Sequence, residues 1–161
     1  GAAVVTVRDW TATPVVGADV VLDFSACTDV RLAADQADAL LSVDCPLRLV
    51  HTTTDAAGVA HFTVMGSGSG VASLPDPPNC LRIYADGVLL GSVSVVILDR
   101  DGVGGLTPSD LSGWAADYFG ATNPDRSDLD GNHVVSIADL SRWANVFFSG
   151  NETLSAGPYC P

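Results

Sequence analysis

Aspartates recur with the same spacing at two places in the C-terminal third of the chain. Each group lies at positions 1, 3 and 12 of a twelve-residue run, and the two runs start 29 residues apart, at 99 and 128. The groups are Asp99, Asp101 and Asp110, and then Asp128, Asp130 and Asp139. Carboxylate oxygens with this spacing can wrap around one hard cation such as Ca²⁺. The sequence therefore predicts two calcium sites that arose by internal duplication.

The remaining positions of each run supply further oxygens. In the second run Asn132 stands at position 5, the carbonyl of Val134 at position 7 and Ser136 at position 9. The first run offers the carbonyl of Gly105 and the hydroxyl of Thr107 at the matching positions. Position 5 of the first run is Val103, however, which has no side-chain oxygen. We therefore expect the first site to be weaker or to use a water molecule there.

A helix is predicted to begin inside each run. Thr107 and Ser136 are suitable N-cap residues, and Pro108 suits the first helical position. Trp114 and Trp143 follow at matched places, on the apolar stripe of each predicted helix. One such phrase alone could be an ordinary surface turn rich in Asp and Gly. Two copies with matched tryptophans favour the metal interpretation.

Residues 99–148 resemble a type I dockerin module, which is a duplicated pair of EF-hand-like calcium loops, each followed by a helix. The runs 99–111 and 128–140 carry the resemblance. It implies two bound calcium ions and a cohesin partner that contacts loop positions 10 and 11. Those positions are Pro108-Ser109 in the first run and Ile137-Ala138 in the second. Position 6, usually glycine in the family's second loop, is His133 here.

The composition limits the partners. The formal net charge is −12, from 18 Asp and one Glu against seven Arg, with no Lys. Nucleic acids and anionic membranes are excluded as partners by this balance because both require basic patches. No run of about twenty apolar residues is present, so we expect no membrane span.

Four cysteines indicate two disulfides in an oxidising compartment. They are Cys27, Cys45, Cys80 and Cys160, and three pairings are possible. We favour Cys27 with Cys45, and Cys80 with Cys160; four reduced, buried thiols are the alternative. The chain begins at Gly1 instead of Met, which fits signal-peptide cleavage or an expression scar. An extracellular or cell-surface location is therefore expected.

The first 98 residues show the pattern of an all-β domain. Short runs rich in Val, Ile and Thr are separated by Gly, Pro and Asp turns, and they predict strands at 2–7, 18–24, 47–53, 59–65, 80–85 and 88–98. The segments 14–22 and 52–62 resemble bacterial immunoglobulin-like and carboxypeptidase-regulatory-like domains, which implies a β-sandwich with a structural or adhesive role.

The expected fold class is mostly β with a small α C-terminal part. An immunoglobulin-like β-sandwich over residues 1–98 contains a helical insertion at 28–44 and a flexible loop at 66–70. A dockerin-like module with a C-terminal tail covers 99–161. No linker separates the two parts, since the strand ending at Leu98 leads directly into Asp99.

Catalysis finds little support in the sequence. The only histidines are His51 and His61, both in predicted strands, and His133 in a calcium loop. No nucleophile elbow, phosphate loop or zinc-protease helix is present. We therefore expect a protein that is not an enzyme.

The favoured function is a secreted structural subunit that assembles with itself into a filament, tube or surface layer stabilised by Ca²⁺ and disulfides. A dockerin-type module that binds a cohesin is the first alternative, although its two recognition pairs differ. A carbohydrate-binding or adhesive module is the second. Exposed aromatic side chains would mark it, but Trp10 and Tyr84 are explained equally well as core residues.

Overall fold

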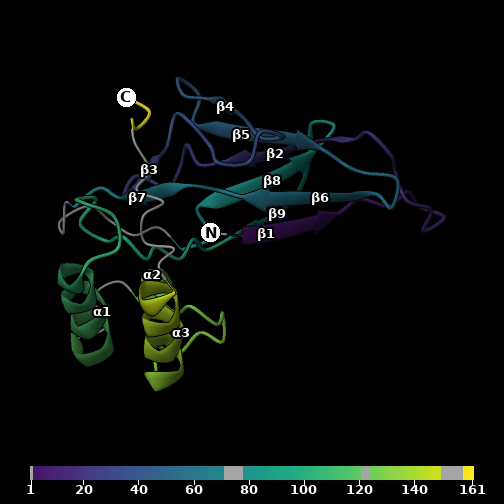
Figure 1. The fold of residues 1–161 in the computed structure, drawn as a ribbon. Coiled ribbons are helices and arrows are strands. Elements are labelled where there is room, and N and C mark those ends of the chain that lie inside the picture. The colour runs from purple at the N-terminus through teal and green to yellow at the C-terminus, as the bar shows by residue number, and fades with distance from the viewer. Residues whose placement is uncertain (1, 71–77, 121–123, 150–157) are drawn as a thin grey trace.

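We describe the protein from a computed structural model, for residues 2–70, 78–120, 124–149 and 158–161. The fold is mostly β with a small C-terminal helical part, as expected (Figure 1). The strands are β1 (Ala2–Thr6), β2 (Asp19–Asp23), β3 (Val30–Leu32), β4 (Ser42–Asp44), β5 (Leu49–Thr53), β6 (Val59–Thr63), β7 (Gly66–Gly68), β8 (Leu81–Ala85) and β9 (Val88–Val93). The helices are α1 (Pro108–Gly120), α2 (Pro124–Ser127) and α3 (Ile137–Phe148).

The strands form three antiparallel sheets. The largest has the order β4-β5-β2-β8-β9, while β1 pairs with β6 and β3 with β7. Alternate residues of the strands point inward, as the period of two in a strand requires. The β1–β6 pair and the five-stranded sheet share one apolar core, to which they contribute Val5, Val20, Leu22, Val50, Ala60, Phe62, Leu81 and Ala85.

All six predicted strands are present, with shorter ends. The last of them stops at Val93, so residues 94–98 connect the sheet to the loop that begins at Asp99 without forming strand. The predicted helical insertion at 28–44 is wrong, because this segment contains β3 and β4 and no helix. The Ala-rich stretch that suggested a helix carries Asp35 and Asp38, which favour turns. Tertiary contacts decide the outcome, since β3 pairs with β7 and β4 with β5.

The segment 66–70 is not a free loop, contrary to expectation. Gly66–Gly68 form β7, and the N–H of Gly68 donates to the carbonyl of Asp99 at 2.7 Å. A Cβ on Gly68 would lie 2.2 Å from the Arg100 carbonyl oxygen. One on Gly102 would lie 2.5 Å from the carbonyl oxygen of Gly68. These glycines are needed because the backbones of β7 and of the loop 99–110 are in direct contact.

The favoured disulfide pairing is also wrong. The bridges join Cys27 to Cys80 and Cys45 to Cys160. Cys27 follows β2 and Cys80 precedes β8, and these antiparallel neighbours place the two cysteines at the same end of the sheet. Proximity in the sheet therefore outweighs proximity in the sequence. The C-terminal tail is tied to the β part, as expected, but through Cys45.

The end of the chain returns to the sheet region. The N–H of Cys160 donates to Leu32 at 2.8 Å, and Tyr159 forms an isolated bridge with Ala33. Two disulfides of this kind fit an extracellular protein. Within the described residues, no helix is long and apolar enough to cross a membrane.

A buried ion pair connects the helical part to the sheets. The guanidinium of Arg126 donates to both carboxylate oxygens of Asp29 at 2.8 Å, and its third nitrogen donates to the carbonyl of Val95 at 2.6 Å. The side chain of Arg126 is only 1% exposed. Because Asp29 precedes β3 and Arg126 lies in α2, the contact spans most of the chain.

Candidate metal centre

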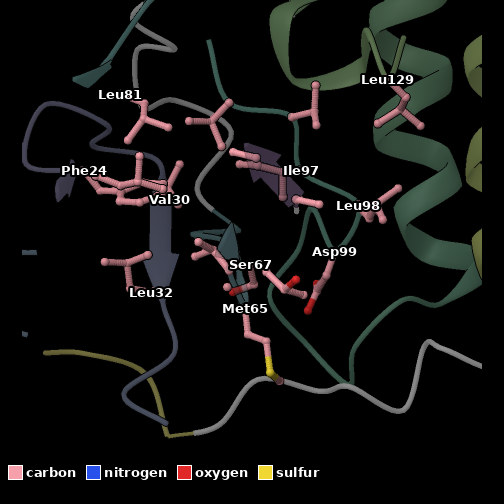
Figure 2. A pocket seen from close by; sticks show the side chains of 18 of the residues that line it. Phe24, Val30, Leu32, Met65, Ser67, Leu81, Ile97, Leu98, Asp99 and Leu129 are labelled. Carbon is pink, nitrogen blue, oxygen red and sulfur yellow. The ribbon is translucent and has the colours of Figure 1, made fainter. Parts of the chain in front are cut away.

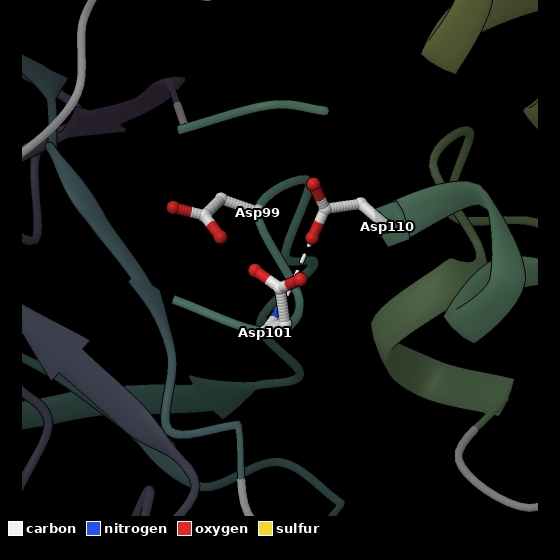
Figure 3. Close-up of side chains that lie close together, drawn as sticks. All are labelled: Asp99, Asp101 and Asp110. Carbon is white, nitrogen blue, oxygen red and sulfur yellow. Dashed lines mark hydrogen bonds between the residues drawn. The ribbon is translucent and has the colours of Figure 1, made fainter. Parts of the chain in front are cut away.

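The three predicted carboxylates of each loop come together in space. Oxygens of Asp99, Asp101 and Asp110 lie within 4.8 Å of one another. Figure 3 shows these three carboxylates facing a common space at the start of α1. Oxygens of Asp128, Asp130 and Asp139 also lie within 4.8 Å of one another, at the start of α3. Each cluster thus joins the two ends of one twelve-residue run.

The twelfth residue of each loop organises the turn around it. One oxygen of Asp110 accepts the N–H groups of Arg100 at 2.6 Å and Asp101 at 3.1 Å. Its other oxygen accepts the N–H of Thr107 at 2.8 Å and its hydroxyl at 3.1 Å. Asp110 is buried, and these hydrogen bonds compensate its oxygens for the loss of water.

Asp139 makes matching contacts in the second loop. Its oxygens accept the N–H of Asp130 at 3.1 Å, and the N–H and hydroxyl of Ser136 at 2.7 and 3.0 Å. Ser136 is the N-cap of α3, and together with Asp139 it forms a capping box. The same side chains thus start the helix and hold the carboxylate in place.

The first residue of each loop accepts bonds from the following turn. Asp99 accepts the N–H of Gly102 at 2.8 Å, and Asp128 accepts that of Gly131 at 2.9 Å. A second oxygen of Asp128 accepts the N–H of His133 at 2.7 Å. His133 has a φ of 65°, a left-handed conformation of the kind that favours glycine.

The two loops differ at position 5, which is Val103 in the first and Asn132 in the second. In the second, the side-chain oxygen of Asn132 accepts the N–H of Val134 at 2.8 Å and so lies on the inside of the turn. In the first, Val103 is 69% exposed. Its N–H donates to Asp101 at 2.9 Å. Of the other predicted ligands in the first loop, Gly105 is buried, and Thr107 donates its N–H to the Asp110 carboxylate.

The hydroxyls of Thr107 and Ser136 contact the last carboxylate of each loop. Each donates to the carboxylate at position 12 of its own loop, so they position that carboxylate. In the first loop the hydroxyl of Ser109, at position 11, donates to Asp101 at 2.6 Å. This contact was not predicted, and the matching residue of the second loop, Ala138, has no hydroxyl.

The electrostatic state of the two clusters differs. Burial raises the pKa of Asp99 to about 6, and repulsion by Asp110 and Asp101 adds to this, against the Gly102 N–H, which lowers it. Burial also acts to raise the pKa of Asp139, but hydrogen bonds from Ser136 and Asp130 outweigh it and lower that pKa.

A buried polar contact joins the two loops. The guanidinium of Arg100, inside the first loop, donates to Asp117 of α1 at 2.7 Å and to the hydroxyl of Ser127 at 2.9 Å. Ser127 itself donates to Asp117 and directly precedes Asp128 of the second loop. Sequence reasoning missed these residues because nothing in their spacing predicted that α1 and α2 would meet here.

The duplication continues into the helices. Trp114 stacks on Tyr118 with ring centroids 5.1 Å apart, and Trp143 stacks on Phe147 at the same distance. An edge-on phenylalanine follows in each helix, Phe119 and Phe148. The repeat of 29 residues holds for all of these aromatic positions, so it could have been found in the sequence.

No family model, curated protein or solved structure matches the chain.

Proposed function

We propose that the protein is a non-enzymatic structural protein in which two calcium ions hold the C-terminal loops and helices in place. The observation that carries the proposal is the convergence of three aspartate carboxylates in each of two loops with the same hydrogen-bond scheme. Three carboxylates at this distance repel one another unless a cation or protons offset their charge. Oxygen ligands from carboxylates, amides and carbonyls are those that Ca²⁺ prefers.

The residues present fit this ion. Asp128, Asp130 and Asp139 would hold it in the second loop, together with Asn132 and the carbonyl of Val134. Asp99, Asp101 and Asp110 would do so in the first, with the carbonyl of Gly105. The ion would supply charge neutralisation and cross-link the start of a helix to the loop before it. The first site should be the weaker because Val103 offers no ligand.

Calorimetric titration with Ca²⁺ tests this part of the proposal. We expect two binding events, of which Asp139→Asn removes the tighter and Asp110→Asn the weaker. Asp35→Asn is the matched control, because Asp35 is an exposed aspartate outside both loops. Absence of binding heat in the unchanged protein, or equal losses in the control, would contradict calcium binding.

A self-assembling extracellular subunit of a filament, tube or surface layer is the use that we propose for this scaffold. The observation that favours it is the edge strand β9, none of whose six residues is buried. Val88, Leu89, Leu90 and Val93 are exposed on it, and it carries no charge. No other strand of the described chain pairs with its outer side. Edge strands of this kind normally carry charged residues or proline, which prevent pairing with another chain.

Light scattering and electron microscopy in millimolar Ca²⁺ and in excess chelator test self-assembly. Ordered particles that dissociate on chelation support a calcium-stabilised subunit. A monodisperse monomer under both conditions argues against it and directs attention to cohesin binding, for which Ile137 is exposed but its counterpart Pro108 differs in kind.

A further inference from the structure

We propose that the indole of Trp10 in one copy of the chain docks into an apolar groove at the opposite end of a second copy. The contact joins chains head to tail. This inference rests on the self-assembly part of the proposed function and names the surfaces that make the contact. It does not depend on strand pairing through β9.

The turn between β1 and β2 displays Trp10. Its side chain is 95% exposed, so the interpretation of Trp10 as a core residue is wrong. One carboxylate oxygen of Asp9 accepts the N–H and hydroxyl of Thr11 at 2.8 and 2.6 Å, and the N–H of Thr13 at 2.9 Å. The guanidinium of Arg8 closes the turn by donating to the carbonyl of Ala12 at 2.9 Å.

A turn held by this many bonds loses little conformational freedom when its tip is buried by a partner. Tryptophan is also the residue most typical of the few anchors that dominate protein interfaces, usually buried in a pocket of the partner. An ordered turn that presents a fully exposed indole is therefore suited to be one half of an interface.

The groove lies between the start of β1, the end of β9 and the first calcium loop. Its volume is about 570 Å³, within the range in which proteins enclose ligands. Apolar side chains in or next to β2, β3 and β8, in the connection after β9 and in the second loop line it, among them Phe24, Leu32, Leu81, Ile97 and Leu129. Figure 2 shows these side chains around the groove, with Asp99 at its edge. Such a lining matches the apolar faces of an indole.

The same chain cannot fill its own groove with Trp10. Ala2 and Ala3 line the groove, and the chain leaves it along β1 toward the turn. A strand rises by about 3.3 Å per residue, which places Trp10 on the order of 20 Å away. In Figure 1 the purple turn after β1 lies at the far right, and the helices lie at the lower left. The occupant must therefore come from another molecule.

The charges at both surfaces favour a second copy of this chain. With a net charge of −12, two copies repel one another over most of their surfaces. The charged residues of the Trp10 turn are Arg8 and Asp9, whose formal charges cancel. Among the described residues, Asp99 and Arg142 are the charged ones of the groove lining. With one Ca²⁺ bound between Asp99 and the two other carboxylates of its cluster, the formal charges at this end also sum to zero. Contact between these two neutral ends thus avoids most of the repulsion. Since the surfaces differ, the contact is heterologous and can propagate.

The test uses two variants with complementary defects, studied by sedimentation velocity in millimolar Ca²⁺. Trp10→Ala removes the anchor and leaves the groove, whereas Val96→Glu places a charge in the groove and leaves the anchor. Val96 lines the groove and is 39% exposed, so both variants should keep the unfolding midpoint of the unchanged protein. Leu40→Ala, at another exposed hydrophobic residue, is the control.

We expect higher oligomers from the unchanged protein and the control, and monomers from each variant alone. An equimolar mixture of the two variants should give a complex of two chains and nothing larger, because only one functional anchor and one functional groove remain. The fluorescence of Trp10 should shift to shorter wavelength on association.

Three outcomes would overturn the inference. If Trp10→Ala assembles like the unchanged protein, another surface makes the contact and self-assembly stands. If the folded variants stay monomeric when mixed, Trp10 does not bind this groove. If the unchanged protein is monomeric, self-assembly fails as well, while the calorimetric titration still decides calcium binding.

Discussion

Val103 and Asn132 occupy the same position in the two loops and differ in the one property that a metal site needs. Asn132 presents an amide oxygen on the inside of its turn, where it accepts the N–H of Val134. Val103 has only methyl groups, and they are mostly exposed to solvent. A change at position 103 can therefore alter the ligand set without disturbing a packed core.

Replacing Val103 with Asn should strengthen the first calcium site. The new amide supplies the missing oxygen, and we expect about tenfold tighter binding at that loop, equal to about 1.4 kcal/mol. Calorimetric titration of Val103→Asn, in a background where Asp139→Asn silences the second loop, isolates the effect. Unchanged affinity would show that the first loop already has a complete set of ligands.

The raised pKa of Asp99 makes the metal-free protein sensitive to pH. A folded-state pKa of about 6, above the ordinary value of 3.8, means that the folded state binds this proton more tightly than the unfolded state does. The proton therefore stabilises the fold fully below the ordinary value, and this contribution is lost as the pH rises through about 6. The pKa of Asp139 is lowered in the folded state, so its contribution to stability has the opposite pH dependence. That contribution is present above the ordinary value of 3.8 and is lost as the pH falls below it.

Calcium binding at the first loop should weaken as the pH falls through about 6, because the ion must displace the proton on Asp99. We expect about a tenfold loss at that loop between about pH 7.5 and about pH 5, and a smaller loss at the second. Titrations of Asp139→Asn and Asp110→Asn at both pH values measure the loops separately. Equal losses at the two loops would contradict the assignment to Asp99.

At the scale of elements, β7 and the first calcium loop depend on each other. The N–H of Gly68 donates to Asp99, the first predicted ligand, so the position of the strand affects the position of a carboxylate. The backbones approach too closely for a side chain at either glycine. The short strand β7 therefore fixes the position of the loop 99–110 against the β part.

Gly68→Ala should destabilise the protein by about 1–3 kcal/mol, because the added methyl group overlaps the carbonyl of Arg100 and pushes the loop away. Chemical denaturation measures this loss, and calcium titration should show weaker binding at the first loop. Gly91→Ala is the matched control, since a Cβ there meets nothing within 4 Å. The expectation fails if both variants lose the same stability.

At the scale of the whole molecule, Asp29 and Arg126 connect the sheets to the helical part. Both are buried, and Arg126 also bonds to the carbonyl of Val95 on the connection between the two parts. A buried ion pair adds little net stability when intact, but removal of one partner leaves an uncompensated charge. The two parts should therefore unfold together.

Asp29→Ala should lower the free energy of unfolding by about 3–5 kcal/mol, because the guanidinium of Arg126 stays buried without its partner. Denaturation followed by tryptophan fluorescence and by circular dichroism measures the loss in both parts. Arg82→Ala, which breaks a more exposed pair with Asp23, should cost about 0–1 kcal/mol. A loss as small for Asp29→Ala would show that this contact does not join the two parts.

The two loops, the helices that follow them and most of the strands could be predicted from local sequence patterns. These features depend on interactions between residues close in the chain: the carboxylates of one loop are at most eleven positions apart, and Thr107 and Ser136 cap helices that begin at the next residue. Strand patterns are equally local, since alternation along five or six residues reveals one buried face.

The features that join distant segments depend on the tertiary structure. Cys27 pairs with Cys80 because β2 and β8 are neighbours, and the residues on either side of the Ala-rich stretch form β3 and β4 because β7 and β5 are available as partners. The role of Gly68 and the ion pair of Asp29 with Arg126 depend on backbones that meet across the fold. Trp10 looked like a core residue because its type is apolar, and only the fold placed it outside. Burial and long-range pairing are properties of the packed chain, so a local pattern cannot specify them.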